Sequence, residues 1–239
     1  MSRLKKAFAE TIDYPESDGK PMGETDTHVD LIINLRLALR RFFRRKRDVY
    51  VSGNMMMYYV EGDPTKSVSP DVYVVKGVRK GQRRTYKIWE EGHAPDVVFE
   101  ISSRKTRRQD LDEKVRLYAE LGVKEYFIFD PEYPKRRKPL NAYRLTPSGY
   151  VEVLVSGGRV MSEALGLELV DTGETLRLFD PKARRFLPTE DEESQARLEV
   201  ERKLRAEIEA RRAEAEARQQ AEAELARLRQ EIERLRKKK

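Results

Sequence analysis

The stretch APDVVFEISSRKTRRQDLDEKVRLYAELGVKEYFIFDP, residues 94–131, contains two apolar β segments with a helical segment between them. Residues 96–102 and 125–131 are rich in β-branched and aromatic side chains, which is typical of strands. Between them, apolar side chains at 111, 115, 118 and 121 recur at helical spacing, and Gly122 suits the end of a helix. The stretch therefore predicts a strand, a helix and a second strand in that order.

The segments on either side of this stretch extend the pattern. Upstream, THVDLIINLRLALRRFFRRKR, residues 27–47, carries apolar side chains at helical spacing, with Thr27 available as the N-cap. Further β-type segments lie at 49–53, 55–62, 71–78, 85–90, 141–146, 150–155 and 165–170. One helix, a run of strands, a second helix and more strands predict an α+β fold, with a mixed β-sheet core flanked by helices.

From about residue 190 the composition changes to Glu, Arg, Ala and Leu, which indicates a long helix or coiled coil. We therefore predict a globular domain over 1–187 and a charged C-terminal helical tail over 188–239. A heptad seam is clear in the last two heptads, where its apolar residues are Leu225, Leu228, Ile232 and Leu235. The tail is expected to join two copies in a homodimer, with a lone helix supported by alternating charges as the alternative.

The charge of the chain favours a polyanionic partner. The formal net charge is +7, and the tail from residue 188 holds fourteen basic and fourteen acidic residues, so the excess lies in the globular part. Basic residues cluster there at 40–47, 76–84, 104–108 and 135–138. Such clusters suit nucleic acid, because neutralising phosphates releases counterions. The alternative is that each cluster only solubilises a loop.

The composition and the hydropathy pattern exclude several classes of protein. The chain has no cysteine, which excludes disulfides, thiolate zinc sites and cysteine nucleophiles and fits a reducing, cytoplasmic location. No apolar run approaches membrane-spanning length, and the charged N-terminus lacks the apolar core of a signal peptide. Only two histidines are present, which disfavours a histidine-based zinc hydrolase. We expect a soluble cytoplasmic protein without membrane contact.

Acidic residues occupy two of the predicted strands, where an unpaired carboxylate is costly. Side chains alternate across a strand, so Asp96, Glu100 and Ser102 share one face of 96–102 and apolar residues share the other. Asp96 and Glu100 lie about 13 Å apart at ~3.3 Å per residue, too far to bind one ion together. The second carboxylate is therefore expected from Asp71 in SPDVYVV, residues 69–75, through a hairpin-like connection between neighbouring strands.

Two carboxylates on adjacent strands indicate a site for a hard divalent cation such as Mg²⁺. Such a cation acidifies a water and stabilises the charge that develops on an attacked phosphodiester. Lys114 lies beside the apolar face of its helix and is expected to meet these carboxylates, because a buried ammonium needs a partner. The alternatives are a simple turn for either Pro-Asp pair, and coverage of apolar surface by the stem of Lys114.

The two Pro-Asp segments, together with the lead-in YPESDGKPMGETDTH at 14–28, resemble the Uma2 family of restriction-type endonucleases in the PD-(D/E)XK superfamily. The resemblance spans roughly residues 14–180 and implies a restriction-endonuclease-like fold. It implies metal ligation by Asp71, Glu100 and the backbone carbonyl of Ile101. Ser102 occupies the motif's usual lysine position, so the resemblance implies a migrated lysine, with Lys114 the first candidate and Lys105 the other.

The resemblance and the charge pattern together lead to a hypothesis about function. We expect a metal-dependent endonuclease that hydrolyses DNA with Mg²⁺ or Mn²⁺ through Asp71, Glu100 and Lys114. Phosphates are expected to contact Arg83, Arg84, Arg104, Arg107 and Arg108. Asp96 is expected to orient its neighbours, and His28, which can face the site from the first helix, to have a cap or surface role. The alternatives are an inactive nuclease fold that binds nucleic acid, and an assembly module that acts through the tail.

Overall fold

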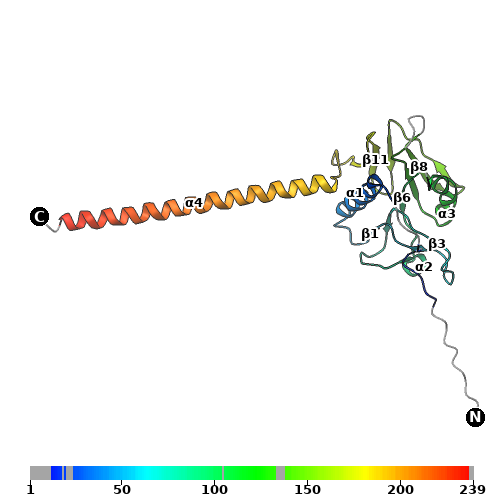
Figure 1. Cartoon of the computed structure of the whole chain (residues 1–239), viewed down its shortest axis with the longest axis horizontal. Helices are drawn as coiled ribbons and strands as arrows, with labels where there is room; N and C mark the ends of the chain where they lie inside the picture. Colours follow the sequence, from blue (N-terminus) through cyan, green and yellow to red (C-terminus); the bar gives the residue numbers. More distant parts are fainter. Residues whose placement is uncertain (1–11, 18, 20–23, 104, 133–137, 237–239) are drawn as a thin grey trace, which may run out of the picture. The chain divides into compact units, whose positions relative to one another are not determined.

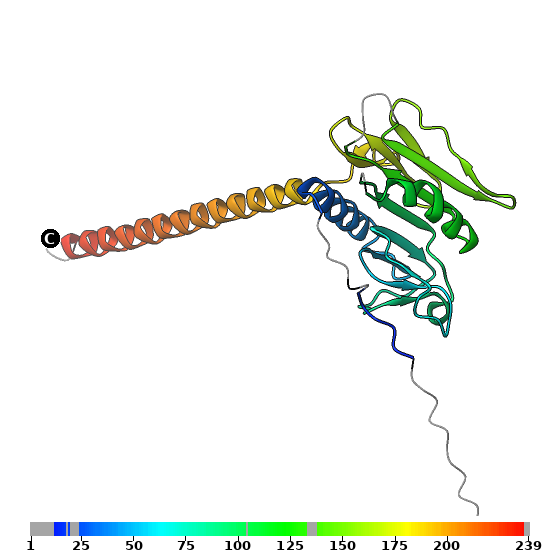
Figure 2. The ribbon, with the colours of Figure 1, turned by 45° about the vertical axis from the view of Figure 1, so that its right-hand side comes forward.

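The computed structural model describes residues 12–17, 19, 24–103, 105–132 and 138–236. The chain divides into two compact units, residues 1–190 and 191–239. The strands and the shorter helices belong to the first unit, and the second consists almost entirely of one long helix (Figures 1 and 2).

The core of the first unit is a six-stranded mixed sheet with the order β1-β4-β6-β7-β8-β9. Its strands are β1 (Val49–Ser52), β4 (Val72–Lys76), β6 (Val97–Ile101), β7 (Glu125–Phe129), β8 (Leu140–Thr146) and β9 (Gly149–Glu152). Strands β6 and β7 are parallel, whereas the other neighbouring pairs of this sheet are antiparallel. A mixed sheet flanked by helices confirms the predicted α+β fold class (Figure 1).

The stretch at 94–131 forms the centre of this sheet. It folds into β6, the π-helical turn η1 (Gln109–Glu113), helix α3 (Lys114–Glu120) and β7. Because β6 and β7 are parallel, this helical segment is the crossover that parallel strands need. Gly122, at φ +80°, follows the end of α3. The predicted strand, helix and strand are confirmed, with a wide helical turn that the apolar spacing did not predict.

Both faces of strand β6 are buried, so the face that carries Asp96, Glu100 and Ser102 meets a core as well as the apolar face. Val97, Phe99 and Ile101 pack into a core that includes helix α1 (Asp26–Phe42). Val98, on the opposite face, belongs to a second core rich in tyrosines: Tyr50, Tyr73, Tyr86, Tyr118 and Tyr126. Glu100 alternates onto this second face, so its carboxylate lies among buried aromatic rings rather than in water.

Helix α1 begins and ends earlier than its sequence pattern predicts. Thr25 rather than Thr27 is the N-cap, because its side chain accepts a hydrogen bond from the backbone N–H of His28. The helix ends at Phe42, so most of the basic cluster at 40–47 lies in the turn that follows. The buried face of α1 packs on the sheet, and its residues are His28, Leu31, Ile32, Leu35, Ala38 and Leu39.

Two smaller sheets complete the first unit. One has the order β3-β2-β5 and the other β10-β11-β12-β13. Their strands are β2 (Met57–Tyr58), β3 (Ser67–Val68), β5 (Tyr86–Lys87), β10 (Arg159–Ser162), β11 (Leu167–Asp171), β12 (Leu176–Asp180) and β13 (Arg185–Phe186). The predicted strands at 55–62 and 85–90 are largely wrong, because each has only two strand residues and helix α2 (Ile88–Glu91) follows β5.

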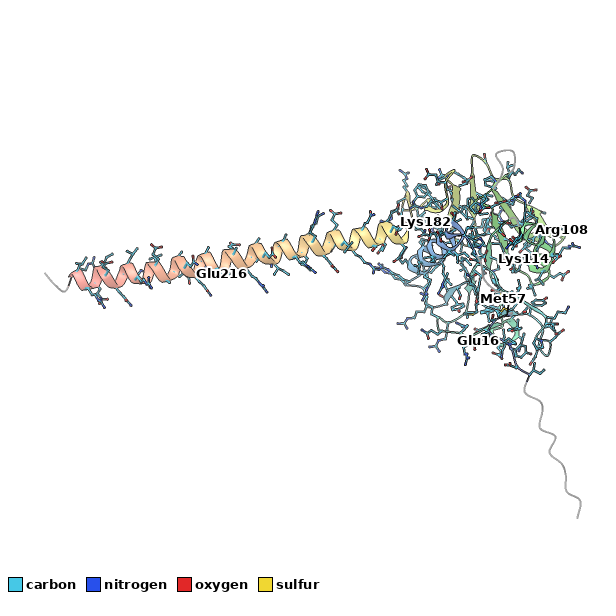
Figure 3. The ribbon with its side chains drawn as sticks, in the orientation of Figure 1. Glu16, Met57, Arg108, Lys114, Lys182 and Glu216 are labelled. Carbon is cyan, nitrogen blue, oxygen red and sulfur yellow. The ribbon has the colours of Figure 1, made fainter. Side chains whose placement is uncertain are left out.

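The second unit is formed by helix α4 (Glu190–Arg236), which is 47 residues long and has no buried residue. Its side chains, among them Glu216, project all around the helix (Figure 3). The exposed apolar residues of its last turns are Leu225, Leu228, Ile232 and Leu235. Within the part of the chain that the structure describes, no helix combines the length and the apolar character that crossing a bilayer requires.

Candidate active site

Asp71, which immediately precedes strand β4, lies beside strand β6, which carries Glu100. The two strands pair in a register that sets Val72 opposite Phe99, and one residue further the same register puts Asp71 opposite Glu100. Oδ2 of Asp71 accepts a hydrogen bond of 2.7 Å from the backbone N–H of Ile101. The expected neighbouring strands are confirmed, although β5 and α2 lie between them in the sequence, so the predicted hairpin-like connection is wrong.

Glu100 is only 2% exposed, and both of its carboxylate oxygens have partners. Oε2 lies 2.9 Å from Nζ of Lys114, and Oε1 accepts a hydrogen bond of 2.6 Å from the hydroxyl of Tyr118. Asp110 is equally buried, and its Oδ1 lies 2.9 Å from the same ammonium. Lys114 therefore joins two buried carboxylates, of which the sequence indicated Glu100 but not Asp110.

Burial and neighbouring charges together set the protonation of this group. Burial raises the pKa of Glu100 to about 8, although the Lys114 ammonium opposes the increase. Burial acts to lower the pKa of Lys114, but the carboxylates of Glu100 and Asp110 outweigh it and raise that pKa above its ordinary value. Lys114 therefore keeps its charge, whereas Glu100 holds its proton more tightly than an exposed glutamate does. Such perturbation is typical of functional sites.

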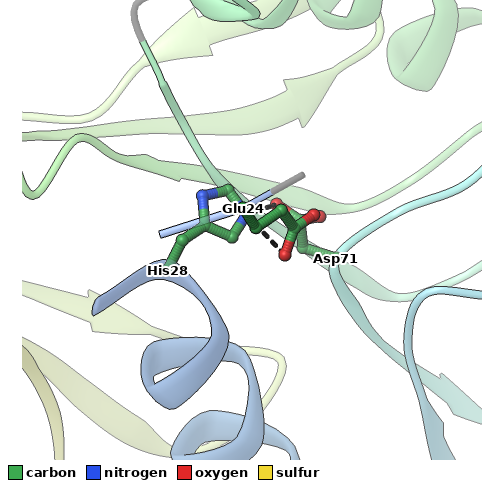
Figure 4. A group of neighbouring side chains, drawn as sticks. All are labelled: Glu24, His28 and Asp71. Atoms are coloured by element: carbon green, nitrogen blue, oxygen red, sulfur yellow. Dashed lines mark ion pairs between the residues drawn. The ribbon is translucent and has the colours of Figure 1, made fainter. Parts of the chain in front are cut away.

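His28 and Glu24 approach Asp71 from the start of helix α1 (Figure 4). Nε2 of His28 lies 3.7 Å from Oδ2 of Asp71 and 3.7 Å from Oε2 of Glu24. Burial acts to lower the pKa of His28, but the two carboxylates outweigh it and raise that pKa above its ordinary value. The expected surface role of His28 is wrong, because the residue is only 8% exposed and faces the predicted acidic site.

Sequence reasoning missed Glu24, Asp110 and Tyr118. Glu24 and His28 are four residues apart at the start of a helix, and Asp110 and Lys114 are four apart at a helical turn. Side chains four residues apart meet on one helix face, and Glu24, which stands just before the N-cap Thr25, continues that spacing. An acidic residue four positions before His28 or Lys114 could therefore have identified Glu24 and Asp110 from the sequence. Nothing in the spacing marks Tyr118 as more than a core aromatic residue.

The position of Asp71 also depends on the close approach of Gly53, which follows β1. A Cβ atom at Gly53 would lie 2.0 Å from the backbone oxygen of Asp71, which no real contact allows. The next residue, Asn54, donates a backbone hydrogen bond of 2.9 Å to the oxygen of Pro70. The end of β1 thus packs backbone against backbone with the segment that carries the Asp71 carboxylate.

Three other predicted residues lie in different surroundings. Asp96 is at the opposite end of β6, where its Oδ2 accepts a hydrogen bond of 2.5 Å from the backbone N–H of Lys76 and its Oδ1 lies 2.7 Å from Nζ of Lys124. Ser102 is buried, and its hydroxyl has no hydrogen-bond partner among the described residues. Lys105 is exposed. The structure thus brings Lys114, rather than Lys105, to the carboxylates.

The predicted phosphate-contacting arginines divide into paired and exposed side chains. Arg83 makes two hydrogen bonds to the carboxylate of Glu91, of 2.5 Å and 2.9 Å, and its guanidinium lies over the ring of Tyr50. Arg107 pairs with Asp130, and Arg84, whose side chain is 85% exposed, pairs with Glu16. Arg108 is exposed (Figure 3). Arg104 lies outside the described residues.

The side chains around Asp71 fit a divalent cation. One ligand atom from each of Glu24, His28 and Asp71 lies within 4.8 Å of the other two. The buried Nε2 of His28 has no hydrogen-bond partner among the described residues, so it has a lone pair to offer when the ring is neutral. Carboxylates and an imidazole are ordinary ligands of first-row divalent metals.

Comparisons with known proteins identify the family of the chain. No curated protein sequence matches the chain. Among solved structures, a "putative nuclease belonging to DUF820" from Anabaena variabilis ATCC 29413 is similar, with 16% identity, a TM-score of 0.46, and coverage of 61% of this chain and 76% of the other. The model of the Uma2 family, described as "Putative restriction endonuclease", matches residues 10–178. Most of the globular unit falls within that match, so the chain belongs to the Uma2 family of restriction-endonuclease-like proteins.

Proposed function

We propose that this protein is a metal-dependent endonuclease that hydrolyses phosphodiester bonds of DNA. The observation that supports it most is the arrangement of Asp71 and Glu100 on adjacent strands with the Lys114 ammonium 2.9 Å from Glu100. Family membership supports the nuclease class. Carboxylates can hold a metal ion that activates water, and a fixed ammonium beside them can stabilise negative charge that develops on the phosphate. Both kinds of group suit the hydrolysis of a phosphodiester.

Asp71 would hold the metal, with Glu100 facing it from the neighbouring strand and the carbonyl of Ile101 as the third ligand that the family implies. A bound divalent ion supplies a more acidic water and neutralises charge on the phosphate. Lys114 stabilises the negative charge that develops on the phosphate, because its ammonium is fixed and largely shielded from water. Tyr118 holds the Glu100 carboxylate in place through its hydroxyl.

The basic surface supports a nucleic-acid substrate. Among the described members of the predicted contact set, Arg108 and Arg84 are exposed, and exposed cations can move to meet phosphates. Arg83 and Arg107 are engaged by Glu91 and Asp130, so we assign them a structural role instead. Contacts to phosphates position a duplex without reading its sequence, and DNA is the substrate that we propose for this site.

We expect the full-length protein to cleave circular DNA in the presence of Mg²⁺ or Mn²⁺ and to lose cleavage when EDTA removes the ion, because the carboxylates alone supply no acidic water. The assay compares supercoiled plasmid, single-stranded circular DNA, branched DNA and RNA under identical ion concentrations. Circular substrates separate internal cleavage from digestion of ends. Binding in a gel-shift assay without cleavage of any substrate would contradict the proposal and support the inactive binding protein instead.

We further propose that α4 mediates a homodimer through the seam of Leu225, Leu228, Ile232 and Leu235. These side chains are exposed at alternating spacings of three and four residues, and an isolated helix gains nothing from exposing them. We expect Leu228→Glu to convert a dimer to a monomer in sedimentation equilibrium. Leu198→Glu, which alters an exposed leucine outside the seam, is the control. Equal masses for Leu228→Glu and the wild type would contradict the dimer.

A further inference from the structure

We propose that Nε2 of His28 and the carboxylate of Glu24 bind the divalent ion of this site together with Asp71, and that the site therefore prefers Mn²⁺ or Co²⁺ to Mg²⁺. The inference rests on the proposed function, because Asp71 belongs to the same site. It extends the acidic ligand set with a nitrogen ligand and an acidic ligand from the start of helix α1 (Figure 4).

The positions of the three side chains favour one shared ion. Nε2 of His28 lies 3.7 Å from an oxygen of each carboxylate, and all three ligand atoms lie within 4.8 Å of one another. Two ligands on opposite sides of an ion, each about 2.1 Å from it, lie about 4.2 Å apart. The distances from His28 are within that limit, and both exceed the length of a hydrogen bond.

The state of His28 independently points to a ligand. The residue is only 8% exposed, and Nε2 is a buried polar atom without a hydrogen-bond partner among the described residues. Leaving such an atom unsatisfied costs about 1–3 kcal/mol. The backbone N–H of His28 is bound to the side chain of Thr25, which fixes the start of the helix from which the ring projects. A metal ion would satisfy the buried nitrogen and both carboxylates together.

The nitrogen ligand sets the metal preference. Mg²⁺ prefers oxygen ligands and retains its waters. A site with an imidazole nitrogen beside carboxylates suits first-row transition metals, and its affinity rises from Mn²⁺ to Co²⁺ along the Irving–Williams order. The oxygens of Glu100 are engaged by Lys114 and Tyr118, so they compete less for the ion than the carboxylates of Glu24 and Asp71. We therefore expect Mn²⁺ and Co²⁺ to bind more tightly than Mg²⁺ by about tenfold or more, because the imidazole nitrogen is a softer ligand than the oxygens that Mg²⁺ prefers.

The test is isothermal titration calorimetry of the full-length protein with MnCl₂, CoCl₂ and MgCl₂, without nucleic acid. We expect His28→Gln and Glu24→Gln each to weaken Mn²⁺ binding by about tenfold or more. Altering a residue that only orients a metal ligand already lowers metal affinity by about 10–100-fold, so loss of a ligand itself should cost at least as much. Glu24 is exposed, so its variant keeps the test valid even if His28→Gln perturbs folding. His93→Gln, which alters the other, exposed histidine, should bind like wild type.

A second readout uses the fact that the chain has two histidines. Paramagnetic Mn²⁺ should broaden the imidazole proton NMR signals of His28 at low metal-to-protein ratios while those of His93 persist. Unchanged Mn²⁺ affinity in His28→Gln and Glu24→Gln, or equal affinity for Mg²⁺ and Mn²⁺, would overturn the inference even in a protein that cleaves DNA. Selective Mn²⁺ binding through His28 in a protein that cleaves nothing would support the inference and overturn the proposed function.

Discussion

Replacing Glu100 by Gln is expected to lower the rate of metal-dependent DNA cleavage by on the order of 10²-fold or more, similar to the loss of one fixed electrostatic group in an enzyme site. The amide keeps the shape of the side chain and can still accept the hydrogen bond from Tyr118. It removes the ionisable carboxyl group that pairs with Lys114 and can supply a negative charge to the site. Single-turnover cleavage of supercoiled plasmid at saturating Mn²⁺ measures the effect.

Glu125→Gln is the matched control for this substitution. Glu125 lies on the adjacent strand β7 and is also 2% exposed, but its carboxylate accepts hydrogen bonds from Ser162 and from the backbone N–H of Glu163. We expect this variant to lose stability while its folded molecules cleave at the wild-type rate. Cleavage by Glu100→Gln at the wild-type rate would refute the role of Glu100.

The pH dependence of stability tests the effect of Glu100 on folding separately from its effect on cleavage. The pKa of Glu100 is raised from 4.5 to about 8 by burial, so the unfolded chain releases this proton at a lower pH than the folded protein. The contribution of Glu100 to the free energy of unfolding therefore falls as pH rises from about 4.5 to about 8. The free energy of unfolding, measured with urea in EDTA, should decrease less between pH 5 and pH 8 for Glu100→Gln than for the wild type.

Replacing Lys114 by Met is expected to reduce the free energy of unfolding by about 3–5 kcal/mol, the typical effect of removing one partner from a buried ion pair. The reason is that Glu100 and Asp110, which are 2% and 1% exposed, lose the ammonium that lies 2.9 Å from each. Cleavage by the folded fraction should be lost as well. Urea unfolding at pH 7 measures the stability.

Lys124→Met is the control for the lysine substitution. Nζ of Lys124 also lies 2.7 Å from a buried carboxylate, that of Asp96, but the lysine side chain is 68% exposed. Exposed ion pairs contribute about 0–1 kcal/mol, and Asp96 keeps its hydrogen bond from Lys76, so we expect a small effect. If Lys114→Met were as stable as Lys124→Met, Lys114 would not be the main partner of the two buried carboxylates.

The central strands and the acidic pair were predictable because they follow from local periodicity. The apolar run over β6 and the alternation of side chains identified Glu100, and the strand that follows Asp71 is a run of β-formers. Lys114 was predictable for a similar reason, since its spacing put it next to an apolar helix face. Each of these inferences needed only the repeat of a strand or a helix.

The remaining features depend on contacts between segments far apart in the sequence. His28 was expected at a cap or at the surface because a residue in the first helical turn is commonly exposed, and its burial follows from where α1 packs on the sheet. Arg83 was expected to contact phosphate, but Glu91 and the ring of Tyr50 engage it. A cluster of like charges in the sequence does not show which members have partners in the fold.

The direction of the Lys114 side chain depends on the π-helical turn η1, which immediately precedes it. The N–H of Lys114 bonds to the carbonyl of Gln109, five residues back rather than four. One residue more or fewer in a helical turn rotates all later side chains by about 100°. A chain with the same acids and lysine but an ordinary α-turn at 109–113 would therefore direct the ammonium away from Glu100. Transplanting this site into another scaffold requires copying the width of that turn along with the side chains.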